Sequence, residues 1–235
     1  MTDIVLAASH GTSSPEGRAA VRRLVEAVAG ALTQPVIGCH VDVEQPDVPS
    51  SLESAAREAG HAIIVPLLLS AGYHVFVDLA DAAEASPIPA TVTPALGPDA
   101  RLVEVLVERL QEAGHRPGDQ VVLAAAGSSD SRAVADCHRT AALLAGRIGS
   151  AVSAGFVSAA APSLPEAVAA ARSRAPGSRV LIATYLLAPG YFAQLAAAAG
   201  ADITTEPLLT PTSTPDQLVR IVADRVGAVR RLSAV

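Results

Sequence analysis

The sequence predicts an α/β fold with two similar domains, each a parallel sheet flanked by helices, related by a pseudo-twofold axis. Two observations support this prediction. The apolar run at residues 62–69 ends at a Ser-Ala-Gly turn, as expected of a parallel strand that is buried on both faces. The same series of motifs also occurs twice, at an offset of about 113 to 118 residues, which is typical of a duplicated βα unit.

The first copy is predicted to hold four strands, at residues 4–8, 36–42, 62–69 and 90–96. Each is an apolar run bounded by residues that favour turns. Ser14 and Pro15 form a helix start signal after the first strand, and apolar residues at helical spacing continue to about Leu32. Further helices are predicted from near Pro49, at residues 74–84 and at residues 101–112.

The second copy follows a turn-rich linker and repeats these motifs in the same order. The linker contains Gly114, Pro117 and Gly118, and it divides the chain into residues 1–116 and 117–235. The segments LAASHGTSSP, EQPDVPSSL, LSAGYHVFVDL and TPALGP of the first copy correspond to LAAAGSSDS, AAPSLPEAV, LAPGYFAQL and TEPLLTP. We therefore expect two packed lobes whose strand ends face a shared cleft.

Polar side chains distinguish the first copy from the second. Glycines and prolines stay in register between the copies, whereas three polar residues are replaced in the second copy: His10 by Ala126, Glu44 by Ala160 and His74 by Phe192. A residue needed for folding should recur in both copies. We therefore predict that the N-terminal domain carries the active site and that the C-terminal repeat lacks the catalytic residues.

The composition excludes several classes of function. The 235-residue chain has a net charge of −6 and no basic run, so no nucleic-acid partner is expected. No apolar stretch reaches the length of a membrane span, and the N-terminus lacks the pattern of an export signal. Cys39 and Cys137 lack metal-binding or redox spacing, so we expect core thiols and a cytoplasmic protein without a membrane partner.

Two histidines and a carboxylate form a ligand set for a borderline divalent metal. His10 and His74 each follow a predicted buried strand, so their side chains should emerge at the same edge of one sheet. Together with Glu44 they suit Fe²⁺, Co²⁺, Ni²⁺ or Zn²⁺. Three protein ligands leave coordination positions open, and an imidazole can also accept a proton near neutral pH. Inserting a metal into a macrocycle requires both abilities, because two ring N–H protons leave as the ion enters.

The sequence resembles the sirohydrochlorin chelatase family, the cobaltochelatases and ferrochelatases of cobalamin and siroheme synthesis, in its long two-repeat form. The segments LAASHGTSSP and VPLLLSAGYHVFVDL carry this resemblance, and VDVEQPDVP is a looser match. The resemblance covers nearly the whole chain. It implies two chelatase-like domains, a tetrapyrrole in the cleft, and a class II enzyme that needs no ATP and no cofactor beyond its substrate metal.

The resemblance also implies a reaction and residue roles. His10 and His74 match the histidines that bind the metal and take up pyrrole protons, and Glu44 matches the acidic ligand, with Asp42 close by. The expected reaction inserts a divalent metal into sirohydrochlorin and releases two pyrrole protons. Fe²⁺, giving siroheme, is favoured, and Co²⁺, giving cobalt-sirohydrochlorin for cobalamin synthesis, is a close second. The second lobe is expected to serve as scaffold and cleft wall.

The substrate carries eight carboxylates, so its rim needs hydrogen-bond donors. Backbone N–H groups at two predicted helix starts can supply them: Gly11, Thr12 and Ser13 in the first copy, and Gly127, Ser128 and Ser129 in the second. The alternative is that these serines only cap helices. Tyr73 and Tyr191 either line the cleft or belong to the core.

The remaining titratable residues give weaker signals. His40 lies on the second predicted strand and can approach the site. His61 and His115 are expected to be exposed, and His138 lies in a helical pattern away from other candidate ligands. Asp78 and Asp81 follow His74 on the same helical face, where they either orient it or are solvated.

Two other functions fit parts of the pattern. A carrier protein would bind Co²⁺, Ni²⁺ or a tetrapyrrole without turnover. A hydrolase or phosphatase would use His10 near a phosphate-binding helix start, but it needs an arginine close behind the histidine. The nearest one, Arg18, is predicted to lie inside the helix.

Overall fold

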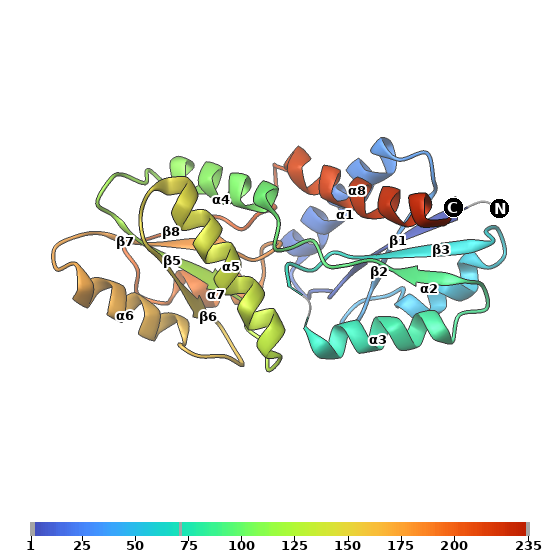
Figure 1. Cartoon of the computed structure of the whole chain (residues 1–235), viewed down its shortest axis with the longest axis horizontal. Helices are drawn as coiled ribbons and strands as arrows, with labels where there is room; N and C mark the ends of the chain where they lie inside the picture. The colour runs from blue at the N-terminus through green and yellow to red at the C-terminus, as the bar shows by residue number, and fades with distance from the viewer. Residues whose placement is uncertain (1–2, 71, 234–235) are drawn as a thin grey trace.

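The computed structural model describes residues 3–70 and 72–233, without the side chains of residues 73–76 and 233. It contains two parallel sheets of four strands each (Figure 1). The first sheet has the order β2-β1-β3-β4 and the second the order β6-β5-β7-β8. The strands are β1 (Asp3–Ser9), β2 (Val36–His40), β3 (His61–Pro66), β4 (Ala90–Val92), β5 (Gln120–Ala125), β6 (Val152–Phe156), β7 (Val180–Tyr185) and β8 (Ile203–Thr204). The predicted fold of two similar parallel-sheet lobes is confirmed.

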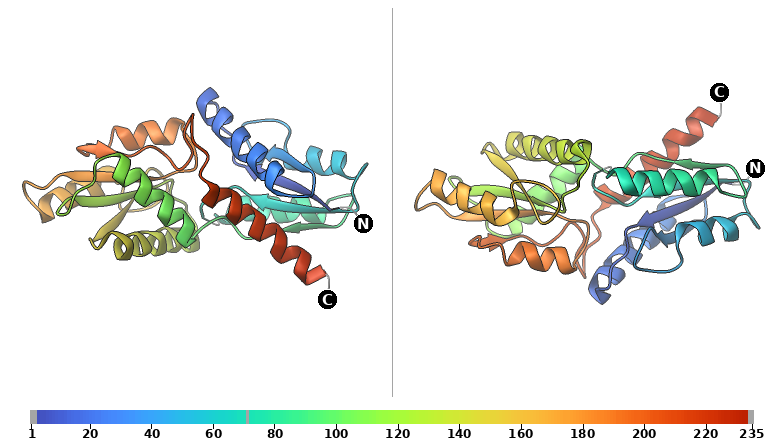
Figure 2. Two further views of the ribbon diagram at one scale, coloured as in Figure 1. Left: turned by 90° about the horizontal axis from the view of Figure 1, so that it is seen from above. Right: turned by 90° about the horizontal axis from the view of Figure 1, so that it is seen from below.

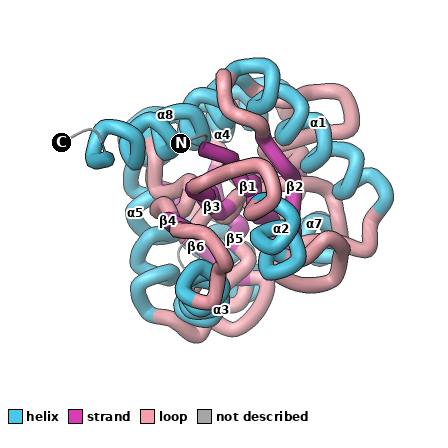
Figure 3. Tube along the Cα trace, turned by 90° about the vertical axis from the view of Figure 1, so that its right-hand side faces the viewer, coloured by secondary structure: helices cyan, strands magenta, loops and turns pink. Residues whose placement is uncertain are grey.

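Helices connect the strands and cover both sheets. In a view along the long axis, in which the two lobes overlap, most helices lie around the strands (Figure 3). The first half of the chain supplies α1 (Pro15–Ala31), α2 (Val48–Ala55), α3 (Tyr73–Glu84) and α4 (Ala100–Glu112). The second half supplies α5 (Ser131–Ile148), α6 (Leu164–Arg174), α7 (Tyr191–Ala197) and α8 (Asp216–Ser233).

Three strands predicted in the first copy end earlier than expected. The strand predicted at residues 36–42 ends at His40. The strand predicted at residues 62–69 leaves the sheet after Pro66, and the next three residues run into the loop before α3. The strand predicted at residues 90–96 ends at Val92. Pro94 has no N–H to donate to a strand ladder, which explains why regular pairing does not continue there. The loops beyond the strand ends are correspondingly longer.

The two halves of the chain exchange their last helices. Helix α4, from the first half, packs against α5 and β7 of the second lobe, and α8 packs against α1 and β3 of the first lobe. Figures 1 and 2 show α4 in green on the second lobe and α8 in red on the first. The boundary predicted between residues 116 and 117 separates the two sequence repeats, and it stays a prediction. It does not separate the packed lobes, because each lobe contains a helix from the other half.

Hydrogen bonds from two arginines hold the exchanged helices in place. Arg109 of α4 is 6% exposed and donates hydrogen bonds to the carbonyl oxygens of Pro207 and Leu208 at 3.1 Å each. Arg225 of α8 donates to the carbonyl oxygen of Ala95 at 3.1 Å. Each arginine thus joins its helix to a loop from the opposite half of the chain.

One apolar core extends through both lobes. It includes Val5 and Leu24 of the first lobe, Leu123 of the second, and Leu106 and Val222 of the exchanged helices. A smaller apolar cluster lies on the opposite face of each sheet. The lobes are therefore joined by shared packing as well as by the chain. Within the described residues, every helix is too short or too polar to cross a lipid bilayer.

Candidate functional site

Loops from the two lobes line one cavity of about 690 Å³. The first lobe contributes the loops that follow β1, β2 and β3, and the second contributes the loops that follow β5, β6 and β7. These are the carboxyl ends of parallel strands, where ligands of open α/β sheets bind. The structure therefore places the expected cleft between facing strand ends.

Glycine shapes the loop that carries His10. Gly11 has φ +93°, and a Cβ there would meet the carbonyl oxygen of Asp42, so the loop after β1 lies directly against the loop after β2. The second lobe repeats this contact with Gly127, at φ +91°, against the carbonyl oxygen of Ser158. His10 itself is exposed and lines the cavity. The shared backbone geometry positions a histidine in one lobe only.

The Glu44 side chain is hydrogen-bonded to the same loop. Its Oε1 accepts a hydrogen bond from the backbone N–H of Thr12 at 2.7 Å, and its Oε2 lies 3.1 Å from Nε of Arg18. The Arg18 Nε also donates to the carbonyl oxygen of Thr12 at 2.8 Å. The Glu44 side chain is 14% exposed, and Glu44 lines the same cavity as His10. One N–H that was expected to bind substrate carboxylates, that of Thr12, is therefore used by Glu44.

His40 joins this polar group from β2. Its Nδ1 is 2.9 Å from the hydroxyl of Ser9, which is buried, and 3.8 Å from Oε1 of Glu44. In the repeat register that pairs Gly11 with Gly127, Ser9 and His40 are replaced by Ala125 and Phe156. Ser9 was missed in the sequence, although the same comparison of copies that selected His10 would have found it.

The side chain of His74 lies outside the described residues. Its backbone lies in the first turn of α3, two residues after Gly72, which lines the cavity. The predicted meeting of His10 and His74 on one ion therefore stays a prediction. Among the side chains that the structure does describe, no three histidine, cysteine, aspartate or glutamate residues are grouped as a metal site. Asp78 and Asp81, on the same helix, are exposed.

The structure also shows the surroundings of the remaining histidine and tyrosine candidates. His61 is not exposed as expected, because its ring lies between Asp3 Oδ1 at 3.2 Å and Thr91 Oγ1 at 3.0 Å. His115 is also partly buried rather than exposed, and His138 is exposed with its ring edge-on to Phe156. Tyr191 is exposed and lines the cavity, whereas the Tyr73 side chain is not among those described.

Both cysteines are buried thiols, as the sequence predicts. Burial raises the pKa of Cys39 to about 12 and that of Cys137 to about 11. Cys137 lines the cavity but is only 3% exposed. A neutral, enclosed thiol is a poor metal ligand, because the thiolate is the form that binds metals.

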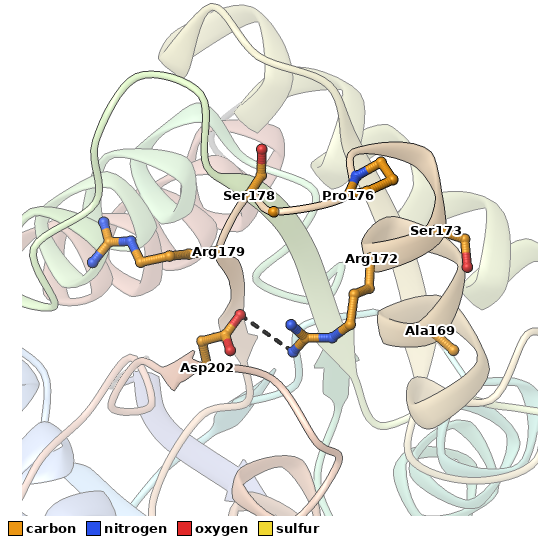
Figure 4. Close-up of a pocket in the computed structure, with 8 residues that line it drawn as sticks. Ala169, Arg172, Ser173, Pro176, Ser178, Arg179 and Asp202 are labelled. Atoms are coloured by element: carbon orange, nitrogen blue, oxygen red, sulfur yellow. Dashed lines mark ion pairs between the residues drawn. The ribbon is translucent and has the colours of Figure 1, made fainter.

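A second hollow, of about 660 Å³, lies in the second lobe at the opposite end of β7 (Figure 4). Two arginines line it, but each is paired with a carboxylate. Arg172 lies 3.2 Å from Asp202, as the dashed line shows, and Arg179 lies 2.6 Å from Asp119. With these charges neutralised, the hollow offers little to an anionic ligand.

A comparison with known families decides the relationship of this chain. The CbiX family model matches residues 4–113 and 120–226, one match for each copy of the repeat. The chain belongs to the CbiX family. No curated protein sequence matches it significantly.

Solved structures share the whole fold. SirB from Bacillus subtilis with Fe³⁺ is 20% identical and has a TM-score of 0.78, and the alignment covers 96% of this chain and 94% of that one. The sirohydrochlorin chelatase SirB from Bacillus subtilis subspecies spizizenii in complex with cobalt is 18% identical with a TM-score of 0.74, covering 96% and 94%. CbiX, described as the terminal enzyme for siroheme biosynthesis in denitrifying bacteria, is 23% identical with a TM-score of 0.66, covering 97% and 99%. At these identities the similarity establishes the fold of this CbiX-family chain.

Proposed function

We propose that this protein is a sirohydrochlorin chelatase, which inserts Fe²⁺ or Co²⁺ into the metal-free macrocycle and releases two pyrrole protons. One observation carries the proposal. The cavity between the lobes has His10 and Glu44 on one wall and Ala126 on the other. A site that binds an ion on one side and leaves the other side without ligands suits the transfer of that ion to a second molecule.

In the proposed reaction His10, Glu44 and His74 hold the incoming ion. Each carboxylate oxygen has two lone pairs, so Glu44 can bind a metal while it accepts its bonds from Thr12 and Arg18. As the ion leaves the imidazoles of His10 and His74 and forms bonds to the ring nitrogens, two pyrrole N–H bonds break, and the freed imidazole lone pairs accept the two protons. Neutral histidine suits both roles near pH 7.

We also propose that Ser128 and Ser129 bind carboxylates at the rim of the substrate. In the first lobe the carboxylate of Glu44 already occupies the N–H of Thr12. In the second lobe the residue at the Glu44 position is Ala160, which has no carboxylate, while Ser128 and Ser129 line the cavity. A substrate carboxylate can therefore accept a hydrogen bond in the second lobe at the position that the Glu44 carboxylate occupies in the first lobe. Gly11 and Ser13 line the same cavity and serve the opposite rim.

The decisive experiment is an anaerobic insertion assay with metal-free sirohydrochlorin. We expect the tetrapyrrole absorption to change faster than in the spontaneous reaction with Fe²⁺ and with Co²⁺, and a low-concentration mixture of both to show which ion is preferred. His10→Ala and His74→Ala should each lose most of the rate. His138→Ala, which changes an exposed histidine outside the cavity, is the control.

Two results would contradict the proposal in different ways. Full activity in both His10→Ala and His74→Ala would reject the site. Binding of the metal or the macrocycle at one equivalent, with no rate above the spontaneous insertion, would favour the alternative of a carrier protein.

A further inference from the structure

Aromatic side chains are scarce in this protein, and two of them are exposed side by side. The chain has three tyrosines, three phenylalanines and no tryptophan. Of the four whose side chains are described, Phe156 and Tyr185 are buried. Tyr191 and Phe192, in the first turn of α7, are 67% and 38% exposed, with ring centroids 6.2 Å apart.

Both exposed rings line the cavity between the lobes. Val43 lines it from the first lobe and is 56% exposed, with a left-handed φ of +59° that β-branched residues rarely adopt. Half of the large hydrophobic side chains that are exposed in the described part of the chain thus gather here. The set comprises Val43, Leu143, Tyr191, Phe192, Leu195 and Leu232. Apolar groups that gather in one concave site indicate a ligand with an apolar surface.

We propose that Tyr191 and Phe192 form an aromatic shelf on which the flat face of the tetrapyrrole rests. This inference rests on the proposed function and adds a role for the second lobe. Phe192 takes the position of His74 in the repeat, so an apolar ring stands where the first copy has a candidate ligand. The first lobe then delivers the metal, and the second binds the macrocycle.

The surroundings of the shelf favour a small flat ligand over a second copy of the chain. Both residues line a cavity of about 690 Å³ rather than lying on a flat outer face. Ser128 and Ser129, whose hydroxyl and N–H groups can donate hydrogen bonds, line the same cavity. An apolar shelf beside hydrogen-bond donors matches a macrocycle with an apolar face and a rim of carboxylates.

The test measures binding of metal-free sirohydrochlorin without metal, by fluorescence and absorption titration. We expect Tyr191→Ser with Phe192→Ser to raise the Kd about ten-fold or more, because stacking on aromatic rings is lost. Leu195→Ser is the matched control. Leu195 lies on the same helix and is also 38% exposed, but it does not line the cavity. Phe192→Leu should weaken binding less than Phe192→Ser, because it keeps apolar area.

Three outcomes would overturn the inference. An unchanged Kd in the double variant, with folding verified by circular dichroism, would show that the shelf does not contact the macrocycle. Sedimentation showing a dimeric wild type and a monomeric double variant would make the rings a subunit interface. Failure of the wild type to bind the macrocycle would reject the proposed function itself. His10→Ala separates the two ideas, because it should keep the macrocycle Kd while losing insertion.

Discussion

The hydroxyl of Tyr185, in the second lobe, donates a hydrogen bond to the carbonyl oxygen of Leu69, in the first lobe, at 2.9 Å. Tyr185 is 2% exposed, and its burial raises the pKa of the phenol well above its usual value. Leu69 belongs to the loop that joins β3 to α3 and lines the cavity. The second lobe, which lacks the candidate ligands, thus holds the loop that leads into α3, the helix containing His74.

Tyr185→Phe should therefore loosen the contact between the lobes without opening a large void. The carbonyl oxygen of Leu69 would lose its partner, and we expect the free energy of unfolding to fall by about 1 to 2 kcal/mol. Denaturant unfolding measures this change. Tyr191→Phe removes an exposed hydroxyl and should have little effect on stability. Equal stabilities of the two variants would show that the hydrogen bond contributes nothing.

Arg18 is expected to position Glu44. Arg18→Gln removes the guanidinium whose Nε contacts both Glu44 and the carbonyl oxygen of Thr12. Loss of a partner that orients a metal ligand typically lowers metal affinity or activity by about ten-fold or more. We expect the kcat of insertion to fall while the Kd for the free macrocycle stays within about two-fold.

The control for this prediction lies one turn further along α1. Arg22 is 72% exposed and approaches Glu26 only at 3.9 Å. Arg22→Gln should keep the wild-type rate. If both variants behaved alike, the position of Glu44 would not depend on Arg18.

Gly11 and Gly30 should respond in opposite directions to alanine. Gly11→Ala places a Cβ against the carbonyl oxygen of Asp42 at φ +93°, so we expect a loss of about 1 to 3 kcal/mol in unfolding free energy. Gly30 lies in α1 with open space around it, and alanine should add about 0.5 to 1 kcal/mol. Thermal unfolding of the two variants tests this difference. A Gly11→Ala protein as stable as the wild type would contradict the tight loop.

Cys39 and Cys137 should be inert in the folded protein. Their pKa values, raised by burial to about 12 and about 11, keep both thiols neutral at pH 8. We expect Ellman's reagent to label them only as fast as the protein unfolds, and to label both at once in guanidinium chloride. Rapid labelling of the native protein would show that one thiol is accessible.

The same pKa shifts predict weaker folding at high pH. A cysteine in the unfolded chain has a pKa of about 8.5. Above that pH, the unfolded chain therefore releases thiol protons that the folded chain keeps. Stability contributed by the neutral thiols is complete below this value. It is lost as the pH rises toward the folded pKa values of about 11 and about 12. Cys39→Ala with Cys137→Ala should reduce this slope in denaturant unfolding measured between pH 8 and 10.

Both sheets could be predicted from the sequence, because continuous apolar runs and a duplicated motif order are local signals. The exchange of α4 and α8 could not. Apolar residues at helical spacing show that a helix has a buried face, but they do not show which sheet covers it. Proline explains one misplaced boundary, where the strand predicted to residue 96 ends at Val92.

The candidate site was predictable only in part. Comparing the two copies selected His10 and Glu44, and both line the cavity, although their roles stay predictions. Ser9, which the second copy replaces with Ala125, follows from the same comparison, whereas the contacts of Arg18 do not. Its side chain reaches back to Thr12 and Glu44, a contact between residues 26 positions apart that no sequence period reveals.

The crossing of α4 and α8 also limits how this gene can be divided. A fragment ending at residue 116 would keep β1 to β4 but lose the helix that covers β3, and it would carry α4 with no sheet to pack on. To fold alone, the first lobe would need α8 fused after β4, in place of α4. A substitution on the apolar face of α8, more than 200 residues from His10, should therefore destabilise the lobe that contains His10.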